Sequence, residues 1–135
     1  IGDKYIRTTE DATLYLQQGP LYSYTQYGYG LSKVVLKNTN TPIGMCGIVN
    51  RETLDHPDIG FAFLPAYMSQ GYAYEIAAAT LQHAHSAWQL RSVLAITLPS
   101  NLRSIRLLEK IGLTLQGKVS FPPANETLLL YRKDW

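Results

Sequence analysis

One stretch of the chain combines a short strand, a glycine-containing turn and the start of a helix, an order suited to binding an anion. The strand is predicted at residues 58–64, and the turn at 66–72 contains Gly71. The first N–H groups of a helix have no partner within the helix, and the helix dipole adds partial positive charge there. A phosphate could therefore bind at this turn, where Gly71 would leave room for it. The alternative is that Gly71 only permits a tight turn, and the segment matches neither a P-loop nor a GxGxxG fingerprint.

Several side chains could take part in acid–base chemistry. Asp58 heads the predicted strand and could face a cleft as a general base, or it could be a solvent-exposed carboxylate. His56, Glu75 and Glu109 are read as surface or structural residues, Glu75 because a carboxylate is favourable in the first turn of a helix. Ser104 lies one turn into another predicted helix, and no Gly-x-Ser-x-Gly elbow surrounds it. A serine hydrolase is therefore not predicted.

The sequence predicts neither a metal site nor a disulfide. His83 and His85 are two residues apart on a predicted helix and so do not share a face, and no other cluster has ligand spacing. Cys46 lies in a predicted strand and is expected to be a small buried hydrophobe. A single cysteine cannot form an internal disulfide, which fits the reducing cytoplasm. We therefore expect a cytoplasmic protein without a metal ion.

The elements that must position these residues give an α/β order. We predict helices at 9–18, from near 73, and at 102–111 after the N-cap Asn101, with strands at 31–37, 43–49, 58–64, 92–97, 113–119 and 127–132. The first three strands follow one another through short links, which implies an antiparallel meander. The strands at 58–64 and 92–97 are joined by a helix and should be parallel. A cleft between them would open beside the anion-binding turn.

Four tyrosines crowd into eight residues after the first predicted helix, which Gly19 and Pro20 are expected to end. They are Tyr22, Tyr24, Tyr27 and Tyr29. Tyrosine has an apolar ring and a polar hydroxyl, so these residues could lie half-buried on an exposed strand or loop. The functional alternative is that they form one wall of a ligand cleft.

Length and composition limit the classes of function. The chain has 135 residues, of which 46% are hydrophobic and 16% charged, as expected for one domain with a real core. The net charge is only +2, and the densest basic group, Arg103, Arg106 and Lys110, lies on one short helix. A nucleic-acid surface needs more clustered positive charge. No apolar run is long enough to span a membrane, so we expect neither nucleic acid nor membrane as a partner.

An ordered series of short motifs runs from the central strand to the last helix. It comprises Ile59-Gly60-Phe61, Gln70-Gly71-Tyr72-Ala73, Asn101, Ser104, Leu108-Glu109-Lys110, Gly112 and Gly117, preceded by the strand Pro42–Val49. The series resembles the GNAT N-acetyltransferase superfamily, and within it the ribosomal-protein N-acetyltransferase-like (RimJ/RimL-type) branch. The likeness covers roughly residues 42–117 well, and it is carried by the order of the motifs rather than by any one of them.

The resemblance implies an acetyl-CoA-dependent enzyme with a mixed, mostly antiparallel sheet, a splayed central parallel strand pair and flanking helices. In this family the turn would hold the pyrophosphate through the backbone of Met68, Ser69, Gln70, Gly71, Tyr72 and Ala73. The pantetheine arm would add as a pseudo-strand to Ala62, Phe63 and Leu64. The side chain of Asn101 would face the cofactor, and Ser104 would protonate the departing thiolate.

The sequence departs from the family pattern at four places, of which Leu113, where an aromatic is common, is a conservative change in the core. Met68 stands where the superfamily has Arg or Gln, and Ser69 replaces a glycine of the branch, which would crowd or stiffen the turn. The family normally has a strand and a helix before the segment that Ile1 resembles. We therefore expect residues 1–135 to form a single, N-terminally short domain, which is either naturally short or a fragment of a longer chain. A homodimer could cover the sheet edge that such a domain would expose.

Acylation of an amine by a thioester defines the chemistry that these residues would perform. The amine must lose a proton to a base, for which Asp58 is the candidate, and the developing oxyanion needs a donor such as a backbone N–H near Phe63. A thiol has an ordinary pKa of about 8.5, so protonation of the leaving group is the least demanding role. We expect direct transfer to a primary amine of a small molecule or peptide, with the cluster Tyr22, Tyr24, Tyr27 and Tyr29 shaping the acceptor pocket.

Two alternatives remain open from the sequence. The fold could serve as a non-catalytic CoA-binding or protein-interaction module, as Met68 and Ser69 suggest. It could also be a nucleotide-binding α/β domain unrelated to acetyl transfer. The sequence does not identify the acceptor amine.

Overall fold

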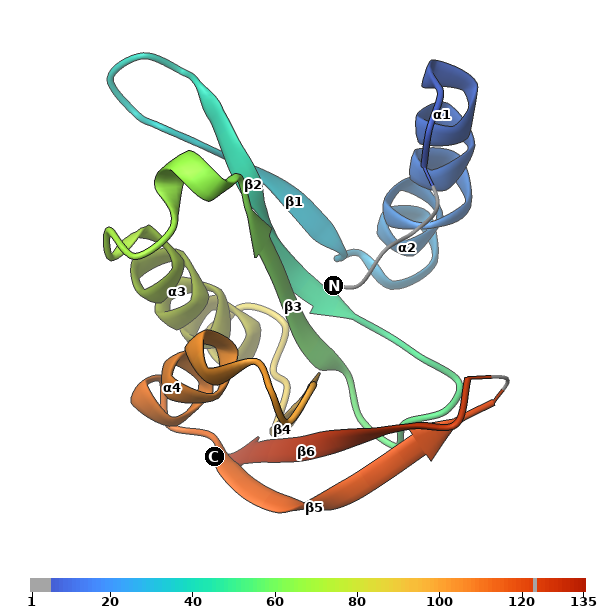
Figure 1. The fold of residues 1–135 in the computed structure, drawn as a ribbon, viewed down its shortest axis with the longest axis vertical. Coiled ribbons are helices and arrows are strands. Elements are labelled where there is room, and N and C mark those ends of the chain that lie inside the picture. Colours follow the sequence, from blue (N-terminus) through green and yellow to red (C-terminus); the bar gives the residue numbers. More distant parts are fainter. Residues whose placement is uncertain (1–5, 123) are drawn as a thin grey trace.

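The computed structural model describes residues 6–122 and 124–135 (Figure 1). The elements are α1 (Thr9–Gln18), α2 (Pro20–Tyr27), β1 (Leu31–Val35), β2 (Pro42–Val49), β3 (Asp58–Phe63), the 3-10 helix η1 (Pro65–Tyr67), α3 (Tyr72–Ser86), β4 (Ser92–Thr97), α4 (Leu102–Lys110), β5 (Thr114–Phe121) and β6 (Glu126–Asp134). Among the described residues, no helix is long and apolar enough to cross a membrane. The expected α/β class is confirmed.

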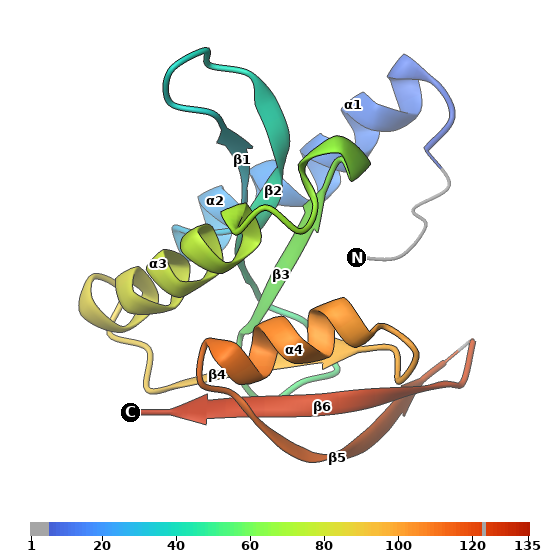
Figure 2. The same ribbon diagram turned by 60° about the vertical axis from the view of Figure 1, so that its left-hand side comes forward.

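The six strands form one mixed sheet in the order β1-β2-β3-β4-β6-β5. The meander β1–β2–β3 is antiparallel, and β3 and β4 form the predicted parallel pair. That parallel pairing is confined to Asp58 opposite Leu94, whereas β3 pairs with β2, and β4 with β6, along their whole lengths. The sheet therefore consists of two halves that diverge from this point, which Figures 1 and 2 show as strands running in different directions.

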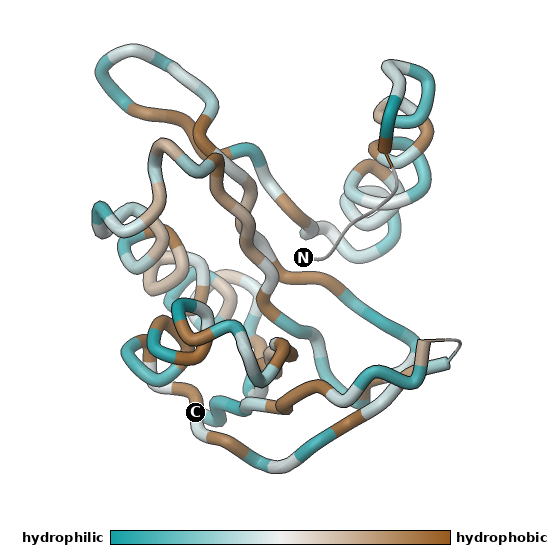
Figure 3. Tube along the Cα trace, in the orientation of Figure 1, coloured by the Kyte–Doolittle hydropathy of each residue, from teal (hydrophilic) through white to brown (hydrophobic). Residues whose placement is uncertain are grey.

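The core lies where α3 and α4 pack on the sheet. Small and branched residues of α3, namely Ala77, Leu81 and Ala84, are buried together with Cys46, Ile48 and Ile59 of β2 and β3 and with Val93, Ala95, Leu108, Leu113 and Tyr131. Figure 3 shows the hydrophobic residues along β2 and the hydrophilic loop that joins it to β1. The α3 helix lies on one side of the β1–β3 half, and α1 and α2 lie on the other (Figure 1).

The N-terminal helices confirm one prediction and correct another. The α1 helix has the predicted bounds, and Thr8 and Asp11 form a capping box in which each side chain accepts the other's backbone N–H. Tyr22, Tyr24 and Tyr27, however, lie in the helix α2 and not in the expected exposed strand or loop, whereas Tyr29 lies in the link to β1. Pro20 is the first residue of α2, because a proline there fits helical φ and its missing N–H would be unpaired anyway. Gly28, with φ of +82°, ends the helix.

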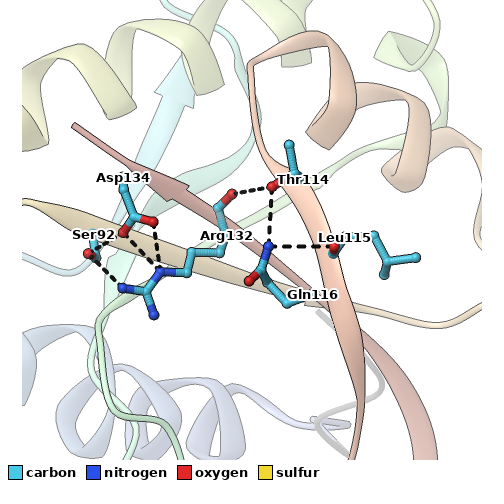
Figure 4. A network of polar contacts seen from close by, with 6 residues as sticks. All are labelled: Ser92, Thr114, Leu115, Gln116, Arg132 and Asp134. Carbon is cyan, nitrogen blue, oxygen red and sulfur yellow. Dashed lines mark hydrogen bonds and ion pairs between the residues drawn. The ribbon is translucent and has the colours of Figure 1, made fainter.

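A polar network links side chains of β4, β6 and β5, which form the second half of the sheet (Figure 4). The Ser92 hydroxyl on β4 donates to Asp134 Oδ1 on β6 at 2.5 Å, and Arg132 Nε donates to both carboxylate oxygens of Asp134 at 2.9 and 3.0 Å. The Thr114 hydroxyl on β5 donates to the Arg132 carbonyl at 3.4 Å. The hydrogen bonds from Ser92 and Arg132 lower the pKa of Asp134. These side-chain contacts add to the backbone ladders that join β4 to β6 and β5 to β6.

The first half-sheet depends on a close approach at Gly47. A Cβ atom placed there would lie 2.1 Å from the Gly30 carbonyl oxygen and 2.8 Å from Leu31 Cα, both of which are backbone atoms. We predict that Gly47→Ala lowers the free energy of unfolding by roughly 3 kcal/mol, because the backbone must shift to admit the methyl group. Urea denaturation followed by circular dichroism would measure this.

Gly117→Ala is the matched control, since Gly117 in β5 has open space around its Cβ position. That variant should change the free energy of unfolding by less than about 1 kcal/mol. Equal effects of the two substitutions would contradict the packing described at Gly47.

Candidate functional site

The edge of β3 that faces β4 carries unpaired backbone groups beyond Asp58. The Leu64 N–H donates to the Ile43 carbonyl of β2 at 2.9 Å, and Ala62 lies opposite Met45. Because backbone direction alternates along a strand, Ala62 and Leu64 turn their N–H and C=O groups toward β2, while Phe61 and Phe63 turn theirs toward the open side. An extended ligand could pair with β3 there. Phe61 was not among the residues that the sequence predicted for this role.

The turn after β3 presents a helix N-terminus. Gly71, with φ of +86°, is the N-cap of α3, and no side chain caps the first N–H groups of that helix. The Gln70 side chain donates to the Ala66 carbonyl at 2.7 Å and so closes the turn on itself. Ser69 adopts a φ of +59°, a left-handed conformation that favours glycine. The predicted anion-binding turn thus has uncapped N–H groups at α3, and Ser69 is its strained residue.

A cavity of about 640 Å³ lies between this turn and α4. It is called here the α3–α4 cavity, and its lining includes Phe61, Ala62 and Phe63 of β3 together with Met68, Ser69, Gly71 and Ala73 of the turn. Its volume is within the range of about 300–1,000 Å³ that is typical of ligand pockets. Most of the residues predicted to hold a cofactor therefore line one cavity.

Three cations of α4 line the α3–α4 cavity, and none of its lining residues is acidic. They are Arg103, Arg106 and Lys110, which are spaced three and four residues apart and so share one helix face. Arg103 Nη1 donates to Met68 Sδ at 3.1 Å, and Lys110 Nζ lies 4.3 Å from the Tyr74 ring centroid. This positive surface beside a helix N-terminus suits a polyanion. Sequence reasoning identified these residues as the densest basic group but assigned them no binding role, although their helical spacing was a usable signal.

A second cavity, of about 290 Å³, lies between the diverging strands and is called the β3–β4 cavity. It shares Phe61, Asn101 and Ser104 with the α3–α4 cavity, so the two meet at these residues. Asn101 Oδ1 accepts the Ser104 N–H at 3.1 Å, which confirms Asn101 as the N-cap of α4. A group held in one cavity could therefore react with a group held in the other.

Asp58 lines the β3–β4 cavity at the point where the two half-sheets meet. Its side chain is 1% exposed, and Arg51 Nε donates to its Oδ1 at 2.9 Å. Burial raises the pKa of Asp58 above its ordinary value, and the nearby Arg51 charge opposes that rise only in part. Asp58 is therefore a buried carboxylate facing a cavity, and Arg51 is a partner that sequence reasoning did not identify.

The four tyrosines separate into two pairs. Tyr22 and Tyr27 line a third cavity of about 310 Å³ between α1, α2 and the end of β2, called the α1–α2 cavity. The Tyr24 hydroxyl donates to the Leu31 carbonyl, which attaches α2 to β1. The Tyr29 hydroxyl accepts a hydrogen bond from Asn50 at 2.9 Å, and its ring stacks on Trp88 at 5.0 Å. The first pair borders a cavity, although the Tyr27 ring also stacks on that of Tyr29 at 6.2 Å, whereas Tyr24 and Tyr29 are engaged in packing.

The remaining candidates have structural surroundings. His83 meets Trp88 edge-on at 4.9 Å, and His85 stacks on Trp135 at 4.7 Å. Cys46 is buried, and burial raises the pKa of its thiol to about 11, so it is not a ready nucleophile at neutral pH. Within residues 6–122 and 124–135, no three His, Cys, Asp or Glu side chains are grouped to hold a metal ion.

Comparison with known proteins gives a family and a fold. A family model described as acetyltransferase (GNAT) domain matches residues 3–114. The uncharacterized N-acetyltransferase YnaD of Bacillus subtilis is 37% identical over 71 residues, which are 51% of this chain and 42% of YnaD. The chain spans about half the length of the curated relatives it matches.

Two solved structures share the fold. The GNAT-family acetyltransferase from Bacillus anthracis superimposes with a TM-score of 0.77 at 27% identity, over 96% of this chain and 76% of that one. The microcin C7 self-immunity acetyltransferase MccE, solved with acetyl-CoA and AMP, gives a TM-score of 0.81 at 12% identity, over 97% of this chain and 74% of that one. At that identity the second likeness concerns the fold alone.

The left-handed conformation of Ser69 leads to a stability prediction. Ser69→Gly should raise the free energy of unfolding by about 1 kcal/mol, because glycine adopts this φ without the clash of a Cβ atom. Ser120→Gly, in the exposed part of β5, is the matched control and should lower it by about 0.5–1 kcal/mol. Thermal unfolding of both variants would measure the difference, and destabilisation by Ser69→Gly would contradict the strained turn.

Proposed function

The chain belongs to the GNAT acetyltransferase family, and we propose that it transfers an acetyl group from acetyl-CoA directly to a primary amine. One observation carries the proposal: a cavity lined by cations and a helix N-terminus meets a second cavity beside the unpaired edge of β3. In the reaction the amine nitrogen bonds to the acetyl carbon, the thioester C–S bond breaks, and the amine loses a proton. The ordered motifs further support membership of the ribosomal-protein N-acetyltransferase-like branch.

The α3–α4 cavity would hold the cofactor. The phosphates of the cofactor would accept hydrogen bonds from the first N–H groups of α3. Arg103 and Arg106, on the opposite side of the cavity, would balance their negative charge. Arg103 contacts Met68, the residue that stands where the family has Arg or Gln, so α4 would supply a cation that the turn lacks. The pantetheine arm would then run along β3 and pair with the open backbone groups of Phe61 and Phe63.

The reacting groups would meet at the junction of the two cavities. A backbone N–H on the open side of β3, at Phe61 or Phe63, would donate to the developing oxyanion. Asp58, in the β3–β4 cavity, would accept the proton of the amine, directly or through a water molecule. Ser104 lies on both cavities and would return a proton to the thiolate. The β3–β4 cavity, which Phe61, Asp58 and Ser104 all line, would thus contain a donor, a base and an acid.

Cofactor binding tests the proposal most simply. We predict saturable binding of acetyl-CoA by calorimetry, weaker binding of adenosine diphosphate, and release of free thiol when a suitable amine is added. Arg103→Gln and Arg106→Gln should each weaken acetyl-CoA binding about 3- to 10-fold, because each removes one charge-assisted contact. Lys118→Gln is the matched control, because Lys118 lies on β5 outside all three cavities. It should leave the affinity for acetyl-CoA unchanged.

Two results would contradict the proposal. Acetyl-CoA binding no tighter than that of adenosine diphosphate would argue for a general nucleotide site. Binding without thiol release for any amine would instead favour a non-catalytic CoA-binding module.

The buried Asp58 predicts a pH dependence. A base must be ionised, so kcat/KM should rise with pH through a pKa above the ordinary value for aspartate of about 3.9. Asp58→Asn keeps an oxygen for the Arg51 hydrogen bond but removes the base. It should lower kcat about 100-fold or more and abolish that acidic limb. An unchanged pH profile in Asp58→Asn would exclude this carboxylate as the base.

The raised pKa of Asp58 also makes the stability of the folded protein depend on pH. The folded-state pKa lies above the unfolded-state value, so the folded protein retains this proton more strongly. The stability that Asp58 contributes is therefore fully present below the unfolded-state pKa and is lost as pH rises through the folded-state pKa. Urea denaturation across this pH range should show less of that loss in Asp58→Asn.

A further inference from the structure

Arg51 lies between the β3–β4 cavity and the α1–α2 cavity and lines both of them. Its Nε donates to the buried Asp58 carboxylate at 2.9 Å, which fixes the position of the guanidinium group. Its terminal nitrogens make no hydrogen bond to any residue that the structure describes, and its side chain is 37% exposed. Arg51 is thus held at one nitrogen and offers its remaining N–H donors to the two cavities.

Such a guanidinium edge selects for one kind of chemical group. Two terminal nitrogens in a planar arrangement match the two oxygens of a carboxylate and form charge-assisted hydrogen bonds with them. An aliphatic amine offers Arg51 no acceptor and would be repelled by its charge. An acceptor held in the β3–β4 cavity, which Arg51 and Ser104 both line, would therefore gain from carrying a carboxylate as well as an amine.

The other charges of the two cavities complement a molecule with both signs. Asp58 and Glu126 line the β3–β4 cavity, and Glu52 lines the α1–α2 cavity. These carboxylates suit the ammonium group of an acceptor but disfavour a dianionic phosphate. Arg51, the one cation among the described residues that line these two cavities, is the partner available to a carboxylate. A zwitterion, with one ammonium and one carboxylate group, meets a partner for each charge.

The α1–α2 cavity adds an apolar surface beside Arg51. Tyr15, Tyr22 and Tyr27 line it together with Leu31 and Val49. Aromatic rings of this kind favour an apolar or aromatic group. Its volume of about 310 Å³ is at the lower end of the range for small-ligand pockets, which suits a side chain and not a macromolecule.

We propose that the acceptor is an amino acid with an apolar or aromatic side chain. Its carboxylate would bind the terminal nitrogens of Arg51, its amine would enter the β3–β4 cavity toward Ser104, and its side chain would contact Tyr22 and Tyr27. The products are the N-acetyl amino acid and free CoA, the amine proton having left through Asp58. This inference rests on the proposed acetyltransferase function and specifies its substrate class.

Matched pairs of acceptors test the inference, each pair differing only in the carboxylate. L-Phenylalanine would be compared with phenethylamine, L-leucine with isoamylamine and L-tyrosine with tyramine, by thiol release from acetyl-CoA. We expect kcat/KM to be at least 10-fold higher for the carboxylated member. Arg51→Gln should remove that preference, mainly by raising KM for the amino acid relative to the decarboxylated amine. Because Arg51 also pairs with Asp58, kcat should fall for both members of a pair, and the ratio of their kcat/KM values is the readout.

Three further variants separate recognition from folding. Arg51→Lys keeps a positive charge beside the buried Asp58 and should retain only part of the preference, because it lacks the paired nitrogens. Tyr22→Ala should lower kcat/KM for L-phenylalanine more than for L-alanine. Arg91→Gln removes an exposed arginine outside all three cavities and should leave the preference intact. Acetyl-CoA binding by calorimetry in every variant confirms that the site is folded.

Several results would overturn the inference while leaving the acetyltransferase function intact. These are equal or better turnover of the decarboxylated amines, higher kcat/KM for spermidine or phosphoethanolamine, or an unchanged preference in Arg51→Gln and Arg51→Lys. Binding of acetyl-CoA with no turnover of any carboxylated acceptor would also overturn it. If the unaltered protein does not bind acetyl-CoA, the proposed function fails first, and the inference fails with it.

Discussion

The strands β3 and β4 are paired through the backbone at one position, Asp58 opposite Leu94, and the whole site depends on this restriction. Each strand is fully paired on its other side, β3 with β2 and β4 with β6, so neither is free to follow its neighbour further. The backbone groups of Phe61 and Phe63 are consequently left without a strand partner. Buried or half-buried backbone groups need hydrogen bonds, and a ligand or water must supply them. The divergence of the strands thus creates both the space and the donors of a binding site.

Charge is distributed differently on the two sides of this opening. The α3–α4 cavity has Arg103, Arg106 and Lys110 and no acid among its lining residues, which suits the phosphates of a cofactor. The β3–β4 cavity has Arg51 together with Asp58 and Glu126. Removing an ion pair such as Arg51–Asp58 from water is costly, so its retention at the point of divergence is more easily understood as a functional feature than as a source of stability. The two sides would then bind different reactants at one junction.

The sequence predicted the elements that are specified locally. The bounds of α1, its capping box, the N-cap Asn101 and the glycine turn before α3 each depend on residues a few positions apart. The helix α2 was missed because Gly19 ends one helix and Pro20 at once begins another. A Gly-Pro pair usually indicates the end of a helix, and here it also precedes a new one. Tyrosine is also neither a strong helix former nor a helix breaker.

The residues that the family motifs contain were predictable, including Asn101 and Ser104 at the start of α4. The turn and the edge of β3 are continuous in sequence, and the family resemblance pointed to both. Arg103 is 35 residues from Met68, so their contact could not be foreseen. Arg51 is seven residues from Asp58, but a loop separates them and only the fold shows that the arginine reaches two cavities. Contacts between residues far apart in the chain therefore complete the site, and the local sequence pattern does not predict them.

Amide hydrogen exchange by nuclear magnetic resonance would test the central claim most directly. In the free protein the amides of Ala62 and Leu64, which pair with β2, should exchange slowly, and those of Phe61 and Phe63 should exchange faster. Saturating acetyl-CoA should protect Phe61 and Phe63, whereas adenosine diphosphate, which lacks the pantetheine arm, should not. Unchanged exchange at both residues with bound acetyl-CoA would contradict the account, because the open edge of β3 would then not be where the cofactor binds.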